Sequence, residues 1–320
     1  DTNDAVFSIV AQQVSLTVTV QGSGTVSLDP PGGSYGVGTV VELNAAGLPN
    51  WQFVSWSGDL SGSTNPETIT MDANKNVTAL FESDGVVEPI VLAEMQSGVS
   101  TASDIVETEA ELVGVSGDLY LASFSSRPLV YIDSVEGLGL TWTLVSAQCS
   151  GRGQTVVEVW YAQGEPSGNG KVSATYKAQV DNAVVSVSRY SGAIGIGDLV
   201  SGNTNGFDGS CSGGTDGTTY SFPLSISGSG NMVYGAVSTR HYDHIPGIEY
   251  TEQAELYQGD GGSVAGLSIV DREVLTSSTI DIDGSLSRPV DWAFVGLEIM
   301  KQTSLSKNKL ERQEFIDLPK

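Results

Sequence analysis

The sequence is poor in positively charged residues. Its 320 residues include 14 lysines and arginines against 38 aspartates and glutamates, which gives a formal net charge of −24 at pH 7. An acidic surface of this kind keeps a protein in solution and repels nucleic acid and anionic lipid. We therefore expect no nucleic-acid partner.

Long apolar runs and catalytic signatures are also missing. No stretch of 18 apolar residues occurs, so we expect no membrane insertion. The first residue is Asp1 rather than methionine, which is typical of a processed, secreted protein. With two histidines and no nucleophile elbow, phosphate loop or dinucleotide fingerprint, the sequence supports neither a catalytic residue nor an enzyme activity.

The sequence has two cysteines, Cys149 and Cys211, and each lies in a loop rich in serine and glycine. In a secreted chain such a pair is expected to form a disulfide, and two unpaired thiols are the alternative. Closing the loop between them would stabilise the fold by roughly 4 kcal/mol through the entropy of the unfolded chain. We predict the disulfide.

The abundant residues indicate an all-β protein. Glycine occurs 39 times, and serine and threonine are frequent, which suits many short strands joined by turns. A segment over residues 117–192 recurs at an offset near 110 residues, for example Ser125-Ser126-Arg127 as Ser238-Thr239-Arg240. Each copy has the pattern of about five strands. The duplication predicts one two-sheet sandwich with pseudo-symmetric halves.

Residues 14–83 form a separate predicted β unit. Alternating apolar residues at Leu16, Val18 and Val20 indicate its first strand. Its motifs are Gly22-x-Gly24-Thr25-Val26, Pro31-Gly32-Gly33-x-Tyr35 and Phe53-x-x-Trp56-Ser57-Gly58-Asp59. With these motifs the unit resembles the divergent internalin-B-type repeat (InlB B-repeat), a module of bacterial surface and secreted proteins. The resemblance implies a small β-grasp-like or Ig-like spacer without catalytic residues, in which Trp56 and Phe81 belong to the core.

The large domain, over residues 90–300, follows a short linker at residues 84–89. It loosely resembles secreted jelly-roll or lectin-like sandwich domains in phrases such as Gly139-Leu140-Thr141-Trp142-Thr143 and Asp291-Trp292-Ala293-Phe294-Val295. The predicted fold is therefore all-β, a small β-grasp-like or Ig-like domain followed by a pseudo-duplicated jelly-roll-like β-sandwich. Four aromatic residues could stack on sugar rings, but their strand pattern favours packing in the core or on a sheet face: Trp142, Trp160, Tyr161 and Trp292.

Both ends of the chain carry apolar residues that suggest assembly. In residues 1–13, Phe7 and Ile9 point one way along a strand, and Val6 and Val10 point the other way. A strand buried on both faces has this pattern, either in the chain's own sandwich or as a donor strand inserted into a neighbouring subunit. The mildly basic tail, residues 301–320, offers apolar anchors at Leu310, Phe315 and Ile316.

Two segments have residues that suit metal ions. The pair in His241-Tyr242-Asp243-His244 lies beside Pro246-Gly247, which favours a surface loop over a zinc site. The glycine-rich loop over residues 198–218 holds four candidate calcium ligands, although their spacing is not that of an EF-hand: Asn203, Asn205, Asp208 and Asp216. Calcium is the one metal that the sequence suggests, and no other cofactor is expected.

These patterns predict a secreted or cell-surface protein without enzyme activity. The leading hypothesis is a structural subunit that forms a homopolymer, as a filament or layer, through exchanged terminal strands or docked tails. The alternative is an adhesive or carbohydrate-binding module on a spacer, with a polysaccharide as partner.

Overall fold

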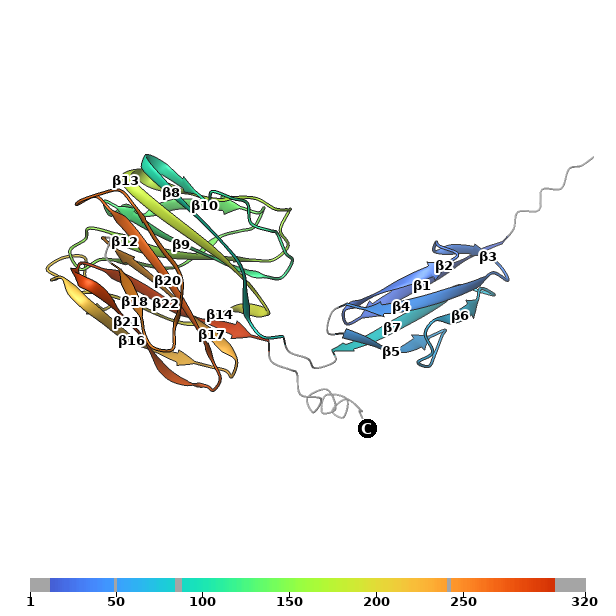
Figure 1. Cartoon of the computed structure of the whole chain (residues 1–320). Coiled ribbons are helices and arrows are strands. Elements are labelled where there is room, and N and C mark those ends of the chain that lie inside the picture. The colour runs from blue at the N-terminus through green and yellow to red at the C-terminus, as the bar shows by residue number, and fades with distance from the viewer. Residues whose placement is uncertain (1–11, 49–50, 84–87, 241–242, 303–320) are drawn as a thin grey trace, which may run out of the picture. The chain divides into compact units, whose positions relative to one another are not determined.

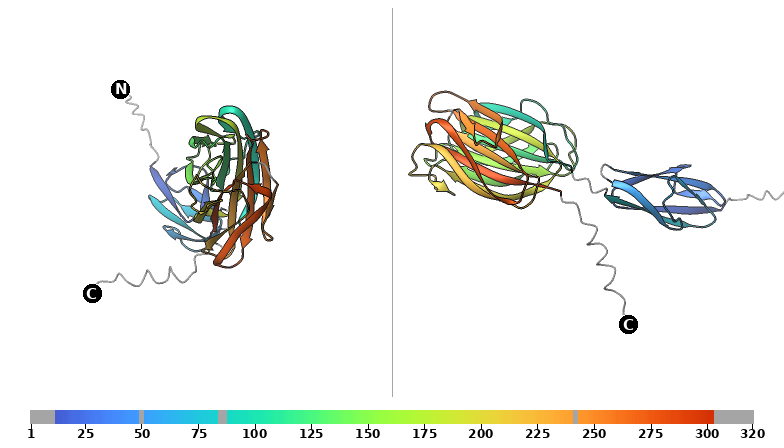
Figure 2. Two further views of the ribbon diagram at one scale, coloured as in Figure 1. Left: turned by 90° about the vertical axis from the view of Figure 1, so that its left-hand side faces the viewer. Right: turned by 60° about the horizontal axis from the view of Figure 1, so that its bottom comes forward.

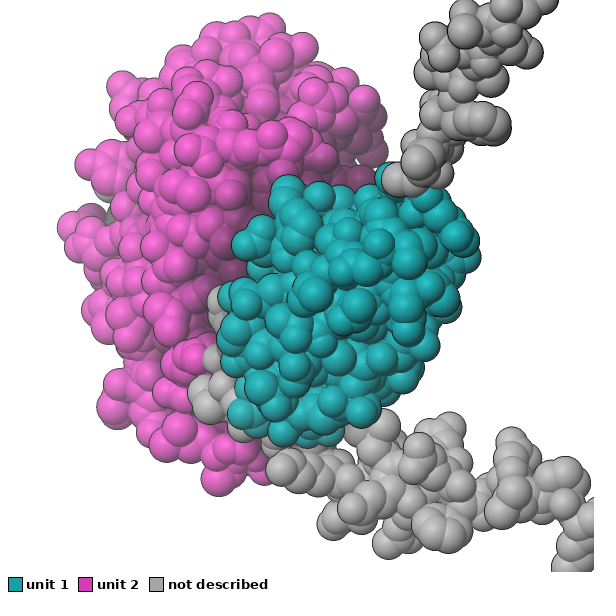
Figure 3. Space-filling view, turned by 90° about the vertical axis from the view of Figure 1, so that its right-hand side faces the viewer, with its two compact units in different colours: residues 1–87, 304–320 teal, residues 88–303 magenta. Residues whose placement is uncertain are grey.

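A computed structural model describes residues 12–48, 51–83, 88–240 and 243–302. The described residues form β-strands joined by turns, and they contain no helix that could cross a membrane. The chain divides into two compact units, whose described parts are residues 12–83 and 88–302 (Figures 1 and 3).

The small unit is a sandwich of two sheets. The first sheet has the order β3-β1-β7-β5 and consists of β1 (Gln13–Gln21), β3 (Ser34–Gly36), β5 (Trp51–Gly58) and β7 (Lys75–Ser83). The second has the order β2-β4-β6 and consists of β2 (Gly24–Asp29), β4 (Val40–Gly47) and β6 (Glu67–Thr70). Strands β1 and β7 are parallel, and the other pairs are antiparallel.

Trp56 and Phe81 lie in the core of the small unit, as predicted. Trp56 and Phe81 are each 2% exposed, and the ring of Phe53 contacts both. The motif glycines are required by this packing. A Cβ atom on Gly22 or on Gly24 would lie less than 3.0 Å from the Phe81 carbonyl oxygen or the Phe81 ring, respectively. Gly22 also has a φ of +88°, which other residues rarely adopt.

The large unit contains two related groups of strands. The first group is β8 (Val91–Glu107), β9 (Leu119–Arg127), β10 (Ile132–Gly137), β11 (Thr143–Cys149), β12 (Val156–Gln163) and β13 (Val172–Ser191). The second group is β14 (Ala193–Asn203), β15 (Gly206–Phe207), β16 (Gly217–Ile226), β17 (Asn231–Thr239), β18 (His244–Pro246), β19 (Thr251–Gln258), β20 (Ala265–Val274), β21 (Ser278–Val290) and β22 (Ala293–Lys301). Figure 2 shows the sheets of this unit from two further directions.

The strand order repeats in the two halves, as the duplicated sequence predicted. The order β13-β9-β12-β11 in the first half recurs as β22-β17-β20-β19 in the second. The short strand β10 pairs with β13, and its counterpart β18 pairs with β21, which precedes β22. The long strand β13 therefore corresponds to β21 and β22 together. The halves are related in topology as well as in sequence.

The large unit has more layers than the predicted two-sheet sandwich. Its described strands form three sheets and enclose three separate apolar clusters. Strand β9 shows why, because Leu119 and Leu121 join the cluster shared by both halves, whereas Tyr120 and Phe124 join the cluster of the first half. A strand covered on both faces has a continuous apolar sequence, from which the number of layers cannot be deduced.

Candidate functional site

The two halves of the large unit meet along a buried line of hydroxyl groups. The Ser125 and Ser238 hydroxyls are 2.6 Å apart, and the Thr155 hydroxyl lies 2.7 Å from that of Ser238. Further along, Ser123 and Tyr234 are joined by a hydrogen bond of 2.7 Å. Because buried hydroxyls need partners, these bonds fix how the halves fit together. Near one end of this line, at Ser125, Thr155 and Ser238, lie the loops that form the candidate sites.

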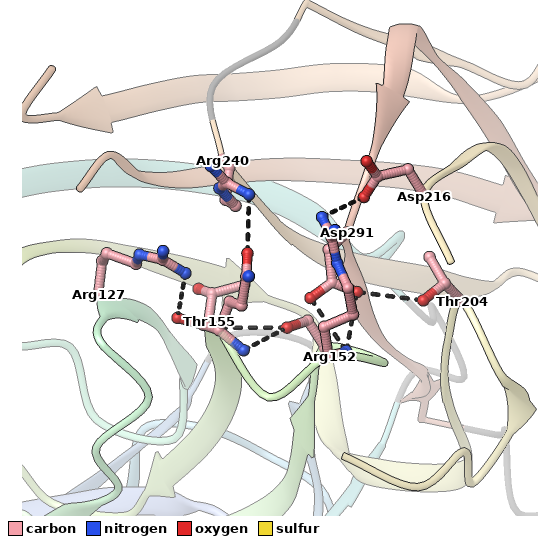
Figure 4. Close-up of polar contacts among 9 residues, drawn as sticks. Arg127, Arg152, Thr155, Thr204, Asp216, Arg240 and Asp291 are labelled. Atoms are coloured by element: carbon pink, nitrogen blue, oxygen red, sulfur yellow. Dashed lines mark hydrogen bonds and ion pairs between the residues drawn. The ribbon is translucent and has the colours of Figure 1, made fainter. Parts of the chain in front are cut away.

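Asp291 organises the first of these loop regions (Figure 4). Its buried carboxylate accepts the backbone N–H of Arg152 at 3.1 Å and the hydroxyl of Thr204 at 3.1 Å. The Arg152 guanidinium forms an ion pair with Asp216. The turn between β11 and β12 is thereby tied to the loop that follows β14.

The predicted disulfide is present in the same region. Cys149, at the end of β11, is bonded to Cys211 across 62 positions of sequence. The side-chain amide of Asn203 donates to the carbonyls of Cys149 and Gly209, at 2.8 and 2.7 Å. Covalent and hydrogen bonds together hold this loop closed.

The four residues suggested for calcium have internal partners here. The Asn203 side-chain oxygen accepts the Asn205 backbone N–H at 2.7 Å, and Asp208 accepts the Ser201 hydroxyl at 2.7 Å. Asp216 is paired with Arg152, as described above. Within the described ranges, no three acidic, histidine or cysteine side chains are grouped to hold a metal ion. Calcium binding by this loop stays a prediction.

The second loop region is the pseudo-symmetric counterpart of the first. Asn182 takes the place of Asp291, and its side-chain oxygen accepts the Thr101 hydroxyl at 3.1 Å, just as Asp291 accepts Thr204. The Asn182 amide donates to the carbonyl of Ser263 in the turn between β19 and β20, at 2.8 Å. This turn corresponds to the β11–β12 turn of the first region.

An open pocket of about 580 Å³ lies at the second region, where no disulfide closes the loops. Strands β8 and β13 form one side, and the β19–β20 turn forms the other. Tyr257, on β19, is 57% exposed and lines the pocket. Polar groups surround it, namely Thr101, Asp181, Asn182, Gln258, Asp260 and Ser263. The pocket therefore combines one aromatic ring with several hydrogen-bonding side chains.

Two arginines lie between the loop regions, at the ends of the central strands. Arg127 is the last residue of β9, and Arg240 follows β17 directly. Arg127 donates to the backbone oxygen of Gln154 at 2.8 Å, and Arg240 donates to its side-chain oxygen at 2.7 Å. Burial, and after it the positive charge of Arg240, lower the pKa of Arg127.

His244 does not lie in a surface loop, which corrects the sequence-based prediction. It begins β18, is 4% exposed, and is bonded to the Tyr220 hydroxyl at 2.8 Å and to Glu252 at 2.6 Å. Burial lowers its pKa to about 4, so the ring is neutral at pH 7. The neighbouring Pro246-Gly247 suggested a loop, because proline and glycine are common in loops. Here the pair ends the short strand β18, in which His244 is buried. His241 lies outside the described residues.

The tryptophans of the large unit pack against its core, as predicted. Trp142 and Trp292 are buried, and Trp160 packs against the cluster of the first half. Trp292 precedes β22 rather than lying within a strand. The residues suggested for assembly lie outside the described residues: Val6, Phe7, Ile9, Val10, Leu310, Phe315 and Ile316.

No sequence motif predicted the pocket. Tyr257, Asn182 and Thr101 are far apart along the chain and meet only through strand pairing. The arginine pair had a local signal, because Ser125-Ser126-Arg127 and Ser238-Thr239-Arg240 occupy matching places in the two copies. These matching triplets indicated the duplication but did not indicate a binding site.

Comparison with known proteins concerns the small unit. Residues 14–85 match the divergent InlB B-repeat domain family. The first unit is thus a module of the kind found in bacterial surface proteins. Neither a curated protein nor a solved structure is found to match this chain.

Proposed function

We propose that this is an extracellular surface protein without enzyme activity, in which the B-repeat unit is a spacer and the large unit binds a polysaccharide. The pocket beside Tyr257 carries the proposal. The disulfide Cys149–Cys211 supports an extracellular location, because structural disulfides persist in oxidising compartments. The B-repeat unit supports a surface location, because this family occurs in bacterial surface proteins.

The chemistry of the pocket suits a sugar. A sugar ring has an apolar C–H face, which packs on an aromatic ring, and hydroxyl groups at its edge, which need donors and acceptors. Tyr257 supplies the ring, while Gln258 and Asn182 supply amides and Asp181 and Asp260 supply carboxylates. A pocket with a few convergent polar groups around an apolar surface is the usual form of a small-molecule site.

A glycan array tests this function. The native chain should bind at least one glycan class, and Tyr257→Ala should abolish that signal, because Tyr257 is the only aromatic side chain among the described residues that line the pocket. Phe207→Ala is the matched control, since Phe207 is an exposed ring (63%) that does not line the pocket. Binding that survives Tyr257→Ala, or is lost equally in both variants, would contradict the assignment.

A second candidate is a structural subunit of a filament or layer, which the apolar residues of the N-terminal segment favour. Phe7 and Ile9 on one face and Val6 and Val10 on the other suit a donor strand. Deletion of residues 1–11 should abolish polymers seen by electron microscopy. The deletion keeps Gln12, whose carbonyl accepts the Val37 N–H, so the small unit should stay folded. Unchanged polymers would exclude strand exchange.

A further inference from the structure

The arginine pair, Arg127 and Arg240, is unusual in so acidic a chain. With the adjacent Arg152, it places three of the 14 basic residues of the sequence around one turn. Arg152 is neutralised by Asp216. Within the described part of the chain, neither member of the pair has a carboxylate within ion-pair distance, and both donate to the uncharged Gln154.

The pair has more donors than its surroundings have acceptors. A guanidinium carries five N–H donors, and the buried Nε of Arg240 has no acceptor among the described residues. The nearby carboxylate of Asp291 already accepts from the Arg152 N–H and from Thr204. The charges of Asp291 and Asp181 oppose the lowering of the Arg127 pKa without outweighing burial, and neither carboxylate pairs with Arg127. Buried donors without acceptors call for an explanation, and two like charges side by side favour an anion between them.

The pair also adjoins the Tyr257 pocket. Arg127 lies directly opposite Asn182 in the β9–β13 ladder, and Asn182 lines the pocket. Both guanidiniums reach toward the same turn, from the ends of the two central strands (Figure 4). The pair therefore adjoins the pocket through Asn182, and neither arginine is itself among the residues that line it.

We propose that the arginine pair binds an oxyanion, a carboxylate or sulfate, carried by an acidic sugar. This inference deepens the proposed function, because it makes the polysaccharide an acidic one, whose charged group binds at the arginines and not beside the pocket carboxylates of Asp181 and Asp260. Planar guanidinium forks match carboxylate and sulfate oxygens, and each fork can donate two parallel hydrogen bonds. The anion binds without proton transfer or covalent change.

The test is NMR of the arginine Nε–H signals of the full chain during titration at fixed ionic strength. Glucuronate or glucose 6-sulfate should shift the Arg127 and Arg240 signals saturably, and glucose should not. A response to only one acid identifies whether the group is carboxylate or sulfate. Absence of any saturable shift with both acids would overturn the inference, whatever the glycan array shows.

Variants separate the pair from general charge effects. Arg127→Gln and Arg240→Gln should each weaken binding of the acid about 10- to 100-fold, the usual effect of losing a charged hydrogen bond. Arg127→Lys keeps the charge without the fork, so it should give an intermediate loss. Arg288→Gln removes the same charge at an exposed site and should leave the affinity unchanged. Equal losses in Arg288→Gln and Arg127→Gln would overturn a specific site.

These measurements also distinguish the two proposals. Neutral glycans that bind through Tyr257 and are insensitive to Arg127→Gln would leave the proposed function standing and refute the acidic ligand. Saturable shifts of both arginines with glucuronate, without any effect of Tyr257→Ala on glycan binding, would do the reverse. Thermal unfolding of each variant, compared with the native chain, excludes loss of folding as the cause.

Discussion

Removal of the Cys149–Cys211 disulfide should destabilise the large unit strongly. The bond spans 62 positions, and cross-linking a loop of that length lowers the entropy of the unfolded chain by an amount worth about 4 kcal/mol at 25 °C. The double variant Cys149→Ala/Cys211→Ser is the appropriate change, because Cys149 is buried and Cys211 is exposed. For a unit of this size, 4 kcal/mol corresponds to a fall in Tm of about 8–16 °C.

Calorimetry of the full chain measures this effect with an internal control. The small unit has no cysteine, so its unfolding transition should not move. Reductant should lower the transition of the native large unit to that of the variant and leave the variant unchanged. A loss below about 1 kcal/mol, or an equal shift of both transitions, would refute the argument from chain entropy. It would mean that the bonds of Asn203 and Asp291 hold the loop by themselves.

Three contacts in the two units should each contribute measurably to stability. Gly24→Ala places a methyl group against the Phe81 ring, so calorimetry should show the small unit alone destabilised by about 1–3 kcal/mol, and an unshifted transition would contradict the packing. Tyr234→Phe removes the 2.7 Å bond to the buried Ser123 hydroxyl, and urea unfolding should show a loss of about 1–2 kcal/mol, whereas no loss would mean that the hydroxyl line does not stabilise the junction. His244 should make stability depend on pH, because burial lowers its pKa from 6.5 to about 4. Its contribution to the free energy of unfolding is complete above pH 6.5 and falls by about 3 kcal/mol as the pH drops from 6.5 to 4. Comparison of the native chain with His244→Gln at pH 7 and pH 4 isolates this effect, and equal slopes would show that His244 does not titrate in this way.

The sequence predicted the fold well where a local pattern has one structural meaning. The glycines at 22 and 24 and the aromatic residues Trp56 and Phe81 identified the small unit, because close packing on Phe81 demands both features. The repeated strand pattern predicted the duplication, because the same order of strands recurs in both halves. The number of sheets in the large unit was predicted wrongly, because Leu119-Tyr120-Leu121 is apolar at every position. Such a run does not show how many layers cover the two faces of β9.

The candidate sites were harder to predict because they depend on register. Thr101 and Asn182 are neighbours only because β8 pairs with β13, and Gln258 reaches Thr101 from the other half, with a bond of 2.8 Å. No local sequence pattern predicts that these three side chains come together. His244 shows the opposite error, since a nearby Pro-Gly pair suggested exposure, and contacts with Tyr220 and Glu252 from other strands bury it.

The proposed function requires that the large unit hold a sugar in the pocket between its halves. A crystal structure of the chain with an oligosaccharide selected from the array will show whether the sugar lies there. We predict a sugar ring stacked on Tyr257, with hydroxyl groups bonded to Asn182 or Gln258. An oligosaccharide bound elsewhere on the unit, with this pocket filled only by solvent, would contradict the proposed function.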